Sequence, residues 1–290
     1  RSEGGDKNVW IGRYYTDSED IYWLDGSYIQ ANSINDGYKV SYAGNHSAVV
    51  LSGTNCRSKW GAMPLVDHPV GYGPYIYNMS QRTYYTTFQM DGPTILCASN
   101  NVTYSTPTYV DCTYKWTYDT DRLDYVSGQG TNNFQVVPKN PLLSGLAWVK
   151  LTLTINSPIN KTKEITKTVW VGAPVISSIS GNNHVDTYGM ATYEAIIPAN
   201  MGATYSWSVE PSGTVYSAGK TASVYFQGDG DYRVYVTATN SCGVSESAVR
   251  YVGVGSYWPE VIYPNPADDK ITLQMGEPAT TLSNTLVTGK

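Results

Sequence analysis

A histidine at the head of an apolar stretch is the residue best suited to acid–base chemistry in this chain. His46 precedes the run Ala48–Leu51, and Ser58 follows in the string Arg-Ser-Lys-Trp-Gly. An imidazole acts as a general base when a second polar group fixes its tautomer and orientation. Ser58 could supply that group, with Asp67 or His68 as alternatives. A plain strand that begins with histidine gives the same pattern, so a structural role for His46 stays open.

The cysteines do not offer an obvious nucleophile. The chain has four of them, Cys56, Cys97, Cys112 and Cys242. None precedes His46, and Cys56 follows it in an expected turn, with no helix N-terminus to lower its pKa. Cys97 and Cys112 flank a polar stretch and either form an intradomain disulfide or remain buried thiols. Cys56 and Cys242 lack an obvious partner and are interpreted as small packed side chains.

This order of residues resembles the C-terminal half of a papain-like peptidase or amidase. In that family the catalytic histidine opens a strand, and the next strand ends in a polar residue just ahead of a Trp-Gly pair, as Ser58 does here. The resemblance implies that His46 is the general base and that Ser58 takes the place of the orienting Asn. The family's Cys precedes its His, so the nucleophile would lie upstream of Arg1 and this chain alone would be inactive. The alternative is a small β module in which His46 is a strand residue.

Tyrosines provide a different candidate, a ligand-binding surface. The chain has 26 Tyr against 3 Phe. An exposed aromatic plane can stack on a sugar ring, and the cluster Tyr72, Tyr75 and Tyr77 is the best candidate for such a surface. Most of the tyrosines are expected instead to fill half-buried sheet positions.

The composition predicts that short strands and turns position these residues. The 290 residues include 27 Gly and 15 Pro, and only 15% are charged, which excludes a helical bundle. The net charge of −5 gives no basic field for nucleic acid or anionic lipid. No apolar run reaches the length of a membrane span. With three histidines and no CxxC pair, no metal site is expected, and no cofactor is expected either.

Two tryptophans mark an internal repeat. Trp116 lies in Thr-Tyr-Lys-Trp-Thr and Trp207 in Thr-Tyr-Ser-Trp-Ser, 91 residues apart. This period suits a β-sandwich domain, and the alternation around each indole predicts that it faces inward. We therefore expect equivalent buried tryptophans in two duplicate β modules.

The strings of this repeat resemble the PKD-like, immunoglobulin-type modules of bacterial surface proteins. They are Gly92–Cys97, Tyr114–Trp116, Ser127–Gly130 and Thr168–Gly172 in the first copy, and Tyr205–Val209 and Gly230–Gly243 in the second. The second copy departs from the first because His184-Val-Asp186 replaces Ile-Leu-Cys. The resemblance implies a spacer or an adhesion platform without catalytic residues.

The C-terminal string Tyr-Pro-Asn-Pro-Ala-Asp-Asp-Lys-Ile-Thr-Leu resembles the opening of the sorting domain used by the type IX secretion system. Its signal residues are Tyr263, Pro264, Asn265 and Pro266. The prolines favour extended backbone, Asn265 suits a turn, and an alternating strand is expected from Lys270. Too few residues follow for a complete sorting domain. The alternative is an ordinary proline-rich linker.

The sequence thus predicts an all-β chain of four parts. They are a β-rich head (1–90), two PKD-like sandwiches (91–173 and 174–256) and the start of a sorting domain (257–290). The expected function is a non-catalytic stalk, adhesion or binding region of an exported bacterial protein, extracellular or on the outer-membrane surface. Expected partners are the type IX machinery and a surface glycan or protein ligand. Trp116, Trp207, Cys97 and Cys112 are the expected structural residues.

Overall fold

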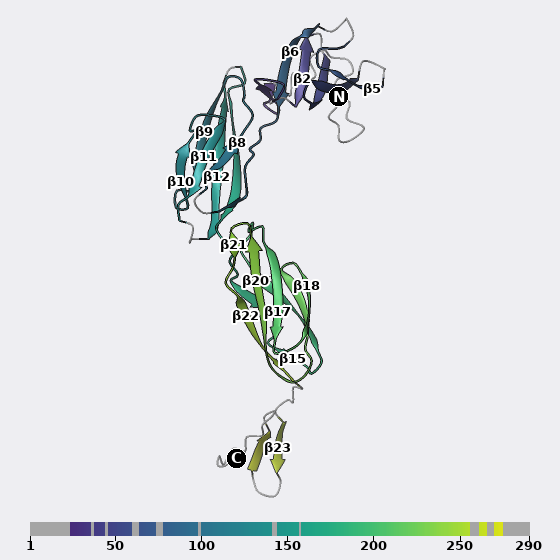
Figure 1. Ribbon diagram of the computed structural model, residues 1–290, viewed down its shortest axis with the longest axis vertical. Coiled ribbons are helices and arrows are strands. Elements are labelled where there is room, and N and C mark those ends of the chain that lie inside the picture. The colour runs from purple at the N-terminus through teal and green to yellow at the C-terminus, as the bar shows by residue number, and fades with distance from the viewer. Residues whose placement is uncertain are drawn as a thin grey trace. The chain divides into compact units, whose positions relative to one another are not determined.

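The regular elements of this protein are β-strands, as the composition predicts (Figure 1). The computed structural model describes residues 24–35, 38–43, 46–59, 64–73, 78–97, 100–140, 144–156, 158–255, 261–265 and 270–274. Within these ranges there is no helix with the length and apolar character needed to cross a bilayer. The chain divides into two compact units, Arg1–Gly172 with Asn200–Gly202, and Ala173–Ala199 with Ala203–Lys290.

The first part of unit 1, which we call the head, is one antiparallel sheet with the order β1-β6-β2-β3-β4-β5. Its strands are β1 (Ile29–Ala31), β2 (Lys39–Ala43), β3 (His46–Ser52), β4 (Asn55–Lys59), β5 (Leu65–Pro69) and β6 (Asn78–Thr86). Alternate residues of β3 and β4 face a small core built from Val40, Tyr42, Ala48, Cys56 and Val70. The turn expected around Cys56 is wrong, because this residue lies inside β4 with its side chain fully buried.

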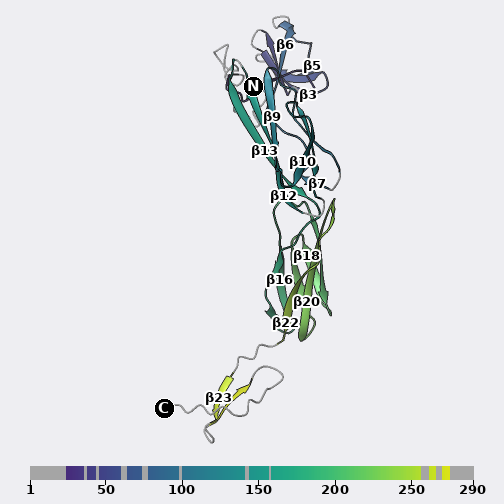
Figure 2. The same ribbon diagram turned by 90° about the vertical axis from the view of Figure 1, so that its left-hand side faces the viewer.

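The rest of unit 1 is a β-sandwich, here called the first sandwich. Its strands are β7 (Ile95–Leu96), β8 (Val102–Ser105), β9 (Cys112–Tyr118), β10 (Leu123–Ser127), β11 (Asn133–Pro138), β12 (Gly145–Ile155) and β13 (Lys161–Val171). One sheet has the order β10-β11-β8 and the other β7-β13-β12-β9. Strands β9, β12 and β13 are antiparallel neighbours and run side by side in Figure 2, whereas β7 pairs with β13 in parallel.

Unit 2 contains the second sandwich, which repeats this arrangement. Its strands are β14 (Ser178–Ser180), β15 (His184–Val185), β16 (Met190–Ile196), β17 (Thr204–Glu210), β18 (Thr214–Ala218), β19 (Thr221–Tyr225), β20 (Gly230–Asn240), β21 (Gly243–Val244) and β22 (Ala248–Val254). The sheet orders are β14-β16-β19-β18 and β15-β22-β20-β17, with β21 added beside β20. Strand β15 pairs with β22 in parallel, as β7 does with β13. The two orders match strand for strand except for β14 and β21.

The two tryptophans occupy matching places in these sandwiches. Trp116 of β9 pairs across the sheet with Leu151 of β12, and Trp207 of β17 pairs with Val236 of β20. Their exposed fractions are 1% and 8%. Each indole N–H donates to a carbonyl in the hairpin of the opposite sheet, Thr131 O at 2.8 Å and Gly219 O at 3.2 Å. Each tryptophan therefore joins the two sheets of its sandwich.

The cysteines differ from the expected pairing. Cys112 and Cys56 are free thiols, whereas Cys97 and Cys242 are each disulfide-bonded. Neither alternative for Cys97 and Cys112 holds for both residues: Cys112 is a free thiol, whereas Cys97 is disulfide-bonded but not to Cys112. Cys112 opens β9 and Cys97 follows β7, at opposite edges of one sheet. Three strand spacings of about 4.8 Å separate such edges, which is beyond the reach of a disulfide. The interpretation of Cys242 as a cysteine without a partner is also wrong.

A separate antiparallel hairpin lies near the C-terminus. It consists of β23 (Val261–Asn265) and β24 (Lys270–Gln274). Tyr263, Pro264 and Asn265 are in β23, and Pro266 lies outside the described residues. The strand expected from Lys270 is present as β24.

Candidate functional site

The structure brings three of the sequence-predicted polar residues together on the buried face of the head. His46, Ser58 and His68 come from the neighbouring strands β3, β4 and β5. Ser58 Oγ lies 3.2 Å from His46 Nε2 and 2.8 Å from His68 Nε2. The exposed fractions are 6% for both histidines and 0% for Ser58. These residues form a buried hydrogen-bonded triplet.

The hydrogen-bond partner of His68 Nδ1 fixes the direction of the hydrogen bonds in this triplet. His68 Nδ1 lies 2.9 Å from the carbonyl oxygen of Pro69, which can only accept, so Nδ1 carries the proton. In a neutral imidazole Nε2 then accepts from the hydroxyl of Ser58. The hydroxyl oxygen is left to accept from His46 Nε2–H. His46 therefore keeps its lone pair on Nδ1, the nitrogen that would serve as a base.

Tyr42 packs against His46, and Cys56 lies beside Tyr42. The ring of Tyr42 stacks on the imidazole with centroids 5.6 Å apart, and its hydroxyl donates to Val70 O at 2.8 Å. Burial raises the pKa of Tyr42, with a smaller contribution from the adjacent Cys56. Burial likewise raises the pKa of the Cys56 thiol. Cys56 is thus held as a neutral thiol, which is the opposite of an activated nucleophile.

Asp67 does not take part in this triplet. It faces outward in β5 and forms a bidentate ion pair with Arg57, with N–O distances of 2.5 and 2.8 Å. The hydrogen bond from Arg57 holds the pKa of Asp67 below its ordinary value. Alternation along β5 points residue 67 to solvent and residue 68 to the core. Of the two alternatives left by the sequence, His68 is the one that reaches Ser58.

The tyrosine cluster of the head is described in part. Tyr72 is 71% exposed, just after β5, and its backbone N–H donates to Pro69 O. Tyr75 and Tyr77 lie outside the described residues. Tyr72 is thus an exposed aromatic plane, whose neighbours in the expected cluster are not defined.

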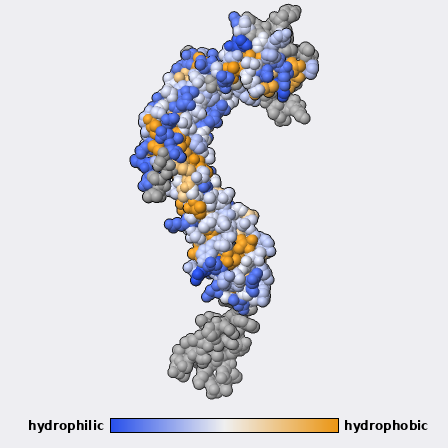
Figure 3. All heavy atoms as spheres, in the orientation of Figure 1, coloured by the Kyte–Doolittle hydropathy of each residue, from blue (hydrophilic) through white to orange (hydrophobic). Residues whose placement is uncertain are grey.

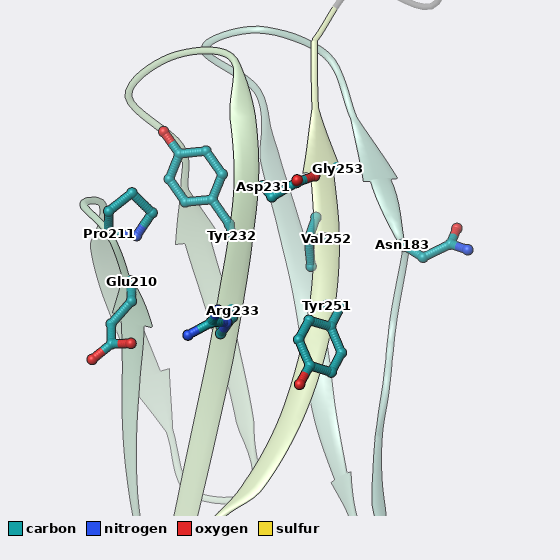
Figure 4. Close-up of a pocket in the computed structure, with 9 residues that line it drawn as sticks. All are labelled: Asn183, Glu210, Pro211, Asp231, Tyr232, Arg233, Tyr251, Val252 and Gly253. Carbon is teal, nitrogen blue, oxygen red and sulfur yellow. The ribbon is translucent and has the colours of Figure 1, made fainter.

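Sequence reasoning missed a pocket on the second sandwich. It has a volume of about 920 Å³ and is lined by Asn183, Glu210, Pro211, Asp231, Tyr232, Arg233, Tyr251, Val252 and Gly253 (Figure 4). Glu210, Arg233 and Tyr251 face one another across β17, β20 and β22. The hydroxyl of Tyr235 donates to Glu210 Oε2 at 3.0 Å. A hydrogen bond with Tyr235 also raises the pKa of Arg233.

Neither site offers a metal-binding set in the part of the chain that the structure describes. No group of three or more His, Cys, Asp or Glu side chains is arranged there to hold an ion. The face of the two sandwiches seen in Figure 3 mixes hydrophilic and hydrophobic residues. The functional candidates are thus the buried triplet of the head and the pocket of the second sandwich.

Two successive sandwiches with matching strand orders define a chain with tandem immunoglobulin-like domains. The family model of the PKD-like domain matches residues 84–145 and 173–252. These two segments are therefore tandem PKD-like domains, as the strings around Trp116 and Trp207 suggest.

Solved structures to which parts of this chain are similar include animal and bacterial proteins. Murine CEACAM1b is 14% identical over 57% of this chain and 100% of its own, with a TM-score of 0.24. The Bacteroides ovatus mixed-linkage glucan utilization locus protein SGBP-B, in complex with a mixed-linkage heptasaccharide, is 14% identical over 56% of this chain and 43% of its own, with a TM-score of 0.21. The FN1-FN3 domains of chicken CNTN1 are 10% identical over 60% of this chain and 67% of their own, with a TM-score of 0.30. Likenesses at this level say nothing of function. No curated protein matches the chain.

Proposed function

We propose that this chain is a non-catalytic stalk and binding region of an exported bacterial surface protein. In this role the two PKD-like sandwiches carry the head and present binding surfaces of their own. The single observation that carries the proposal is the strand-for-strand repetition of the two sandwiches, each with its own tryptophan core. Tandem domains with separate cores are the usual way to build a spacer, because each can fold by itself.

The cysteines support an extracellular location. Cys97 and Cys242 are disulfide-bonded, and such bonds persist in oxidising compartments outside the cytosol. PKD-like and immunoglobulin-like domains are also typical of extracellular proteins. We place this region on the outer-membrane surface or outside the cell.

We propose the type IX secretion system as the export route. The proposal depends on the resemblance of the string from Tyr263 to Leu273 to the opening of a type IX sorting domain, and β23 contains the first three of its signal residues. The test deletes residues 263–290 from the parent protein in a host with this machinery. Loss of surface exposure, measured by protease accessibility on intact cells, is expected. Unchanged surface delivery would refute the route while leaving the stalk function standing.

A papain-like hydrolytic function is the second candidate, and the His46–Ser58 hydrogen bond favours it. Ser58 holds Nε2 of His46 and leaves Nδ1 as the basic nitrogen, which is the role that the resemblance implies for an orienting residue. In this candidate the cysteine nucleophile belongs to a segment of the parent protein that precedes Arg1.

The parent protein tests this candidate directly. His46→Gln should abolish hydrolysis of peptide and amide substrates, whereas Ser58→Asn should retain it, because Asn is the orienting residue of the papain-like family. Equal activity of the parent and the His46→Gln variant would reduce the triplet to a structural role. The stalk function predicts that result, so the two candidates are separable.

A further inference from the structure

The pocket of the second sandwich presents one exposed aromatic ring beside several polar side chains. Tyr251 is 67% exposed and lies opposite Arg233, which lies opposite Glu210 on the next strand. Figure 4 shows the Tyr251 ring nearly face-on, beside the strand that carries it. An aromatic face left in water is an apolar platform with a polar rim. This ring is therefore available for stacking.

A glycine opens the space next to this ring. Gly253 follows Tyr251 by two residues, so both point to the same outer face of β22, opposite the buried Val252. Gly253 pairs with Asp231, and its N–H donates to Asn183 O at 2.9 Å. A Cβ at Gly253 would meet His184 Nδ1 at 3.7 Å and the carbonyl oxygen of Asn183 at 3.9 Å, so an imidazole and a carbonyl border the space that the missing side chain leaves. Asp231 lines the pocket at the paired position of the neighbouring strand (Figure 4).

The polar side chains are held in place before any ligand arrives. Tyr235 donates to Glu210 and also forms a hydrogen bond with Arg233, so the acid and the guanidinium share one anchor. Glu210, Arg233 and Tyr251 stand on paired strands rather than on loops. Groups positioned on rigid strands lose little conformational entropy when they bind.

The chemistry of this pocket selects one class of ligand. Its ring suits the C–H face of a pyranose, and its carboxylates and guanidinium suit neighbouring hydroxyl groups, since they offer acceptors and donors side by side. The pocket is lined by two carboxylates, Glu210 and Asp231, and one guanidinium, Arg233, and the whole chain has a net charge of −5. This excess of negative charge disfavours anionic ligands. We propose that this pocket is a binding site for a neutral oligosaccharide, with Tyr251 as the stacking platform. The proposal goes beyond the stalk function and requires neither the head nor the type IX route.

The first sandwich lacks this arrangement at the matching positions. Counting from the two tryptophans, Asp119, Trp148 and Thr168 replace Glu210, Arg233 and Tyr251. Trp170, which is buried, replaces Gly253. The guanidinium and the open space are thus absent together, and the exposed ring on this face is the indole of Trp148, which is 39% exposed and stands in place of the arginine. We therefore assign the site to the second sandwich alone.

Titration of the full chain with neutral oligosaccharides tests the proposal. The probes are cello-, xylo-, manno- and galacto-oligosaccharides, with oligogalacturonate and heparin fragments as anionic probes, measured by glycan array and then by calorimetry. At least one neutral probe should bind, and Tyr251→Ala should weaken that binding about tenfold or more, as loss of an aromatic anchor does. Tyr251→Phe should keep it within about threefold, because the ring remains. Gly253→Trp, which copies the first sandwich, should abolish it.

The matched control is Tyr216→Ala. Tyr216 is 62% exposed on the other sheet of the same sandwich, so its loss removes a similar aromatic surface away from the pocket. The affinity of the Tyr216→Ala variant for the neutral probe should equal that of the unmodified chain. Tyr72→Ala in the head should also leave the affinity unchanged. Absence of binding to every neutral probe, preference for the anionic probes, or equal losses in Tyr216→Ala and Tyr251→Ala would each overturn the proposal.

Discussion

The two sandwiches share a framework but differ in the side chains that complete it. Tyr104 of β8 pairs with Phe134 of β11 in the first sandwich, and Tyr193 of β16 pairs with Ala222 of β19 at the matching place in the second. Phe134 stacks flat on Trp116, with centroids 5.2 Å apart and an interplanar angle of 4°. Ala222 offers no such ring to Trp207. The strand order and the position of the tryptophan are thus common to both sandwiches. The residue beside the tryptophan differs, since it is Phe134 in the first sandwich and Ala222 in the second.

Removal of the tryptophans should have the largest effect and should separate the two cores. Trp116→Ala should lower the free energy of unfolding of the first sandwich by about 5 kcal/mol, and Trp207→Ala that of the second by about 3 kcal/mol. The first value is larger because Trp116 loses both its burial and its stacking on Phe134. Hydrogen exchange with denaturant, resolved by peptide, measures each sandwich separately. A larger loss in the second sandwich would contradict this reading of the two cores.

Two glycines at matching positions, Gly92 and Gly181, provide a test of how similar the two sandwiches are. Gly92 and Gly181 adopt φ values of 143° and 138°, and a Cβ at either position would overlap the ring of Tyr104 or Tyr193. Gly92→Ala and Gly181→Ala should each cost about 2–3 kcal/mol, from backbone strain and displacement of the tyrosine. Gly219→Ala is a control with positive φ and open space, and it should cost about 1 kcal/mol. If Gly92→Ala and Gly181→Ala lowered the free energy of unfolding by clearly different amounts, the two positions would not be structurally equivalent.

The two tyrosine hydroxyls should distinguish the sandwiches again, with a smaller effect. Tyr104 donates to Pro93 O at 3.1 Å, whereas the buried hydroxyl of Tyr193 has no hydrogen-bond partner among the described residues. Burial raises the pKa of Tyr193 to about 12. Tyr104→Phe should therefore destabilise its sandwich by about 1 kcal/mol, and Tyr193→Phe should be neutral or slightly stabilising. Thermal unfolding of the single variants measures both, and a clear destabilisation by Tyr193→Phe would reveal a partner for that hydroxyl.

The free thiol of the first sandwich should give the smallest effect. Cys112 is half-buried at the start of β9, and Ala203 occupies the matching position just before β17. Cys112→Ala should cost at most about 1 kcal/mol and should leave the disulfide-bonded cysteines intact. The number of free thiols per chain, titrated under denaturing conditions, should be lower by one in this variant. Unmodified Cys112 should react slowly with alkylating agents at neutral pH, because burial raises its pKa to about 11 and the thiolate forms only as the pH approaches that value.

Local patterns in the sequence predicted what depends on neighbouring residues. Alternation around Trp116 and Trp207 predicted strands with inward indoles, and the resemblance to a papain-like enzyme implied that Ser58 lies beside His46. Contacts between distant strands were beyond that reasoning. Cys97 and Cys112 are close in sequence but lie at opposite edges of a sheet, and Glu210, Arg233 and Tyr251 meet through the register of three strands. The inward position of His68 could have been found from the alternation of β5.

The parallel pairing of β7 with β13, and of β15 with β22, has a mechanical consequence. Trp170 N–H bonds to Thr94 O and Gly172 N–H to Leu96 O, and the second sandwich repeats this with Gly253 to Asn183 and Gly255 to Val185. Traction on the two ends of such a domain loads these hydrogen bonds together, in shear, instead of opening them one after another. Each sandwich is therefore expected to resist stretching between its two ends.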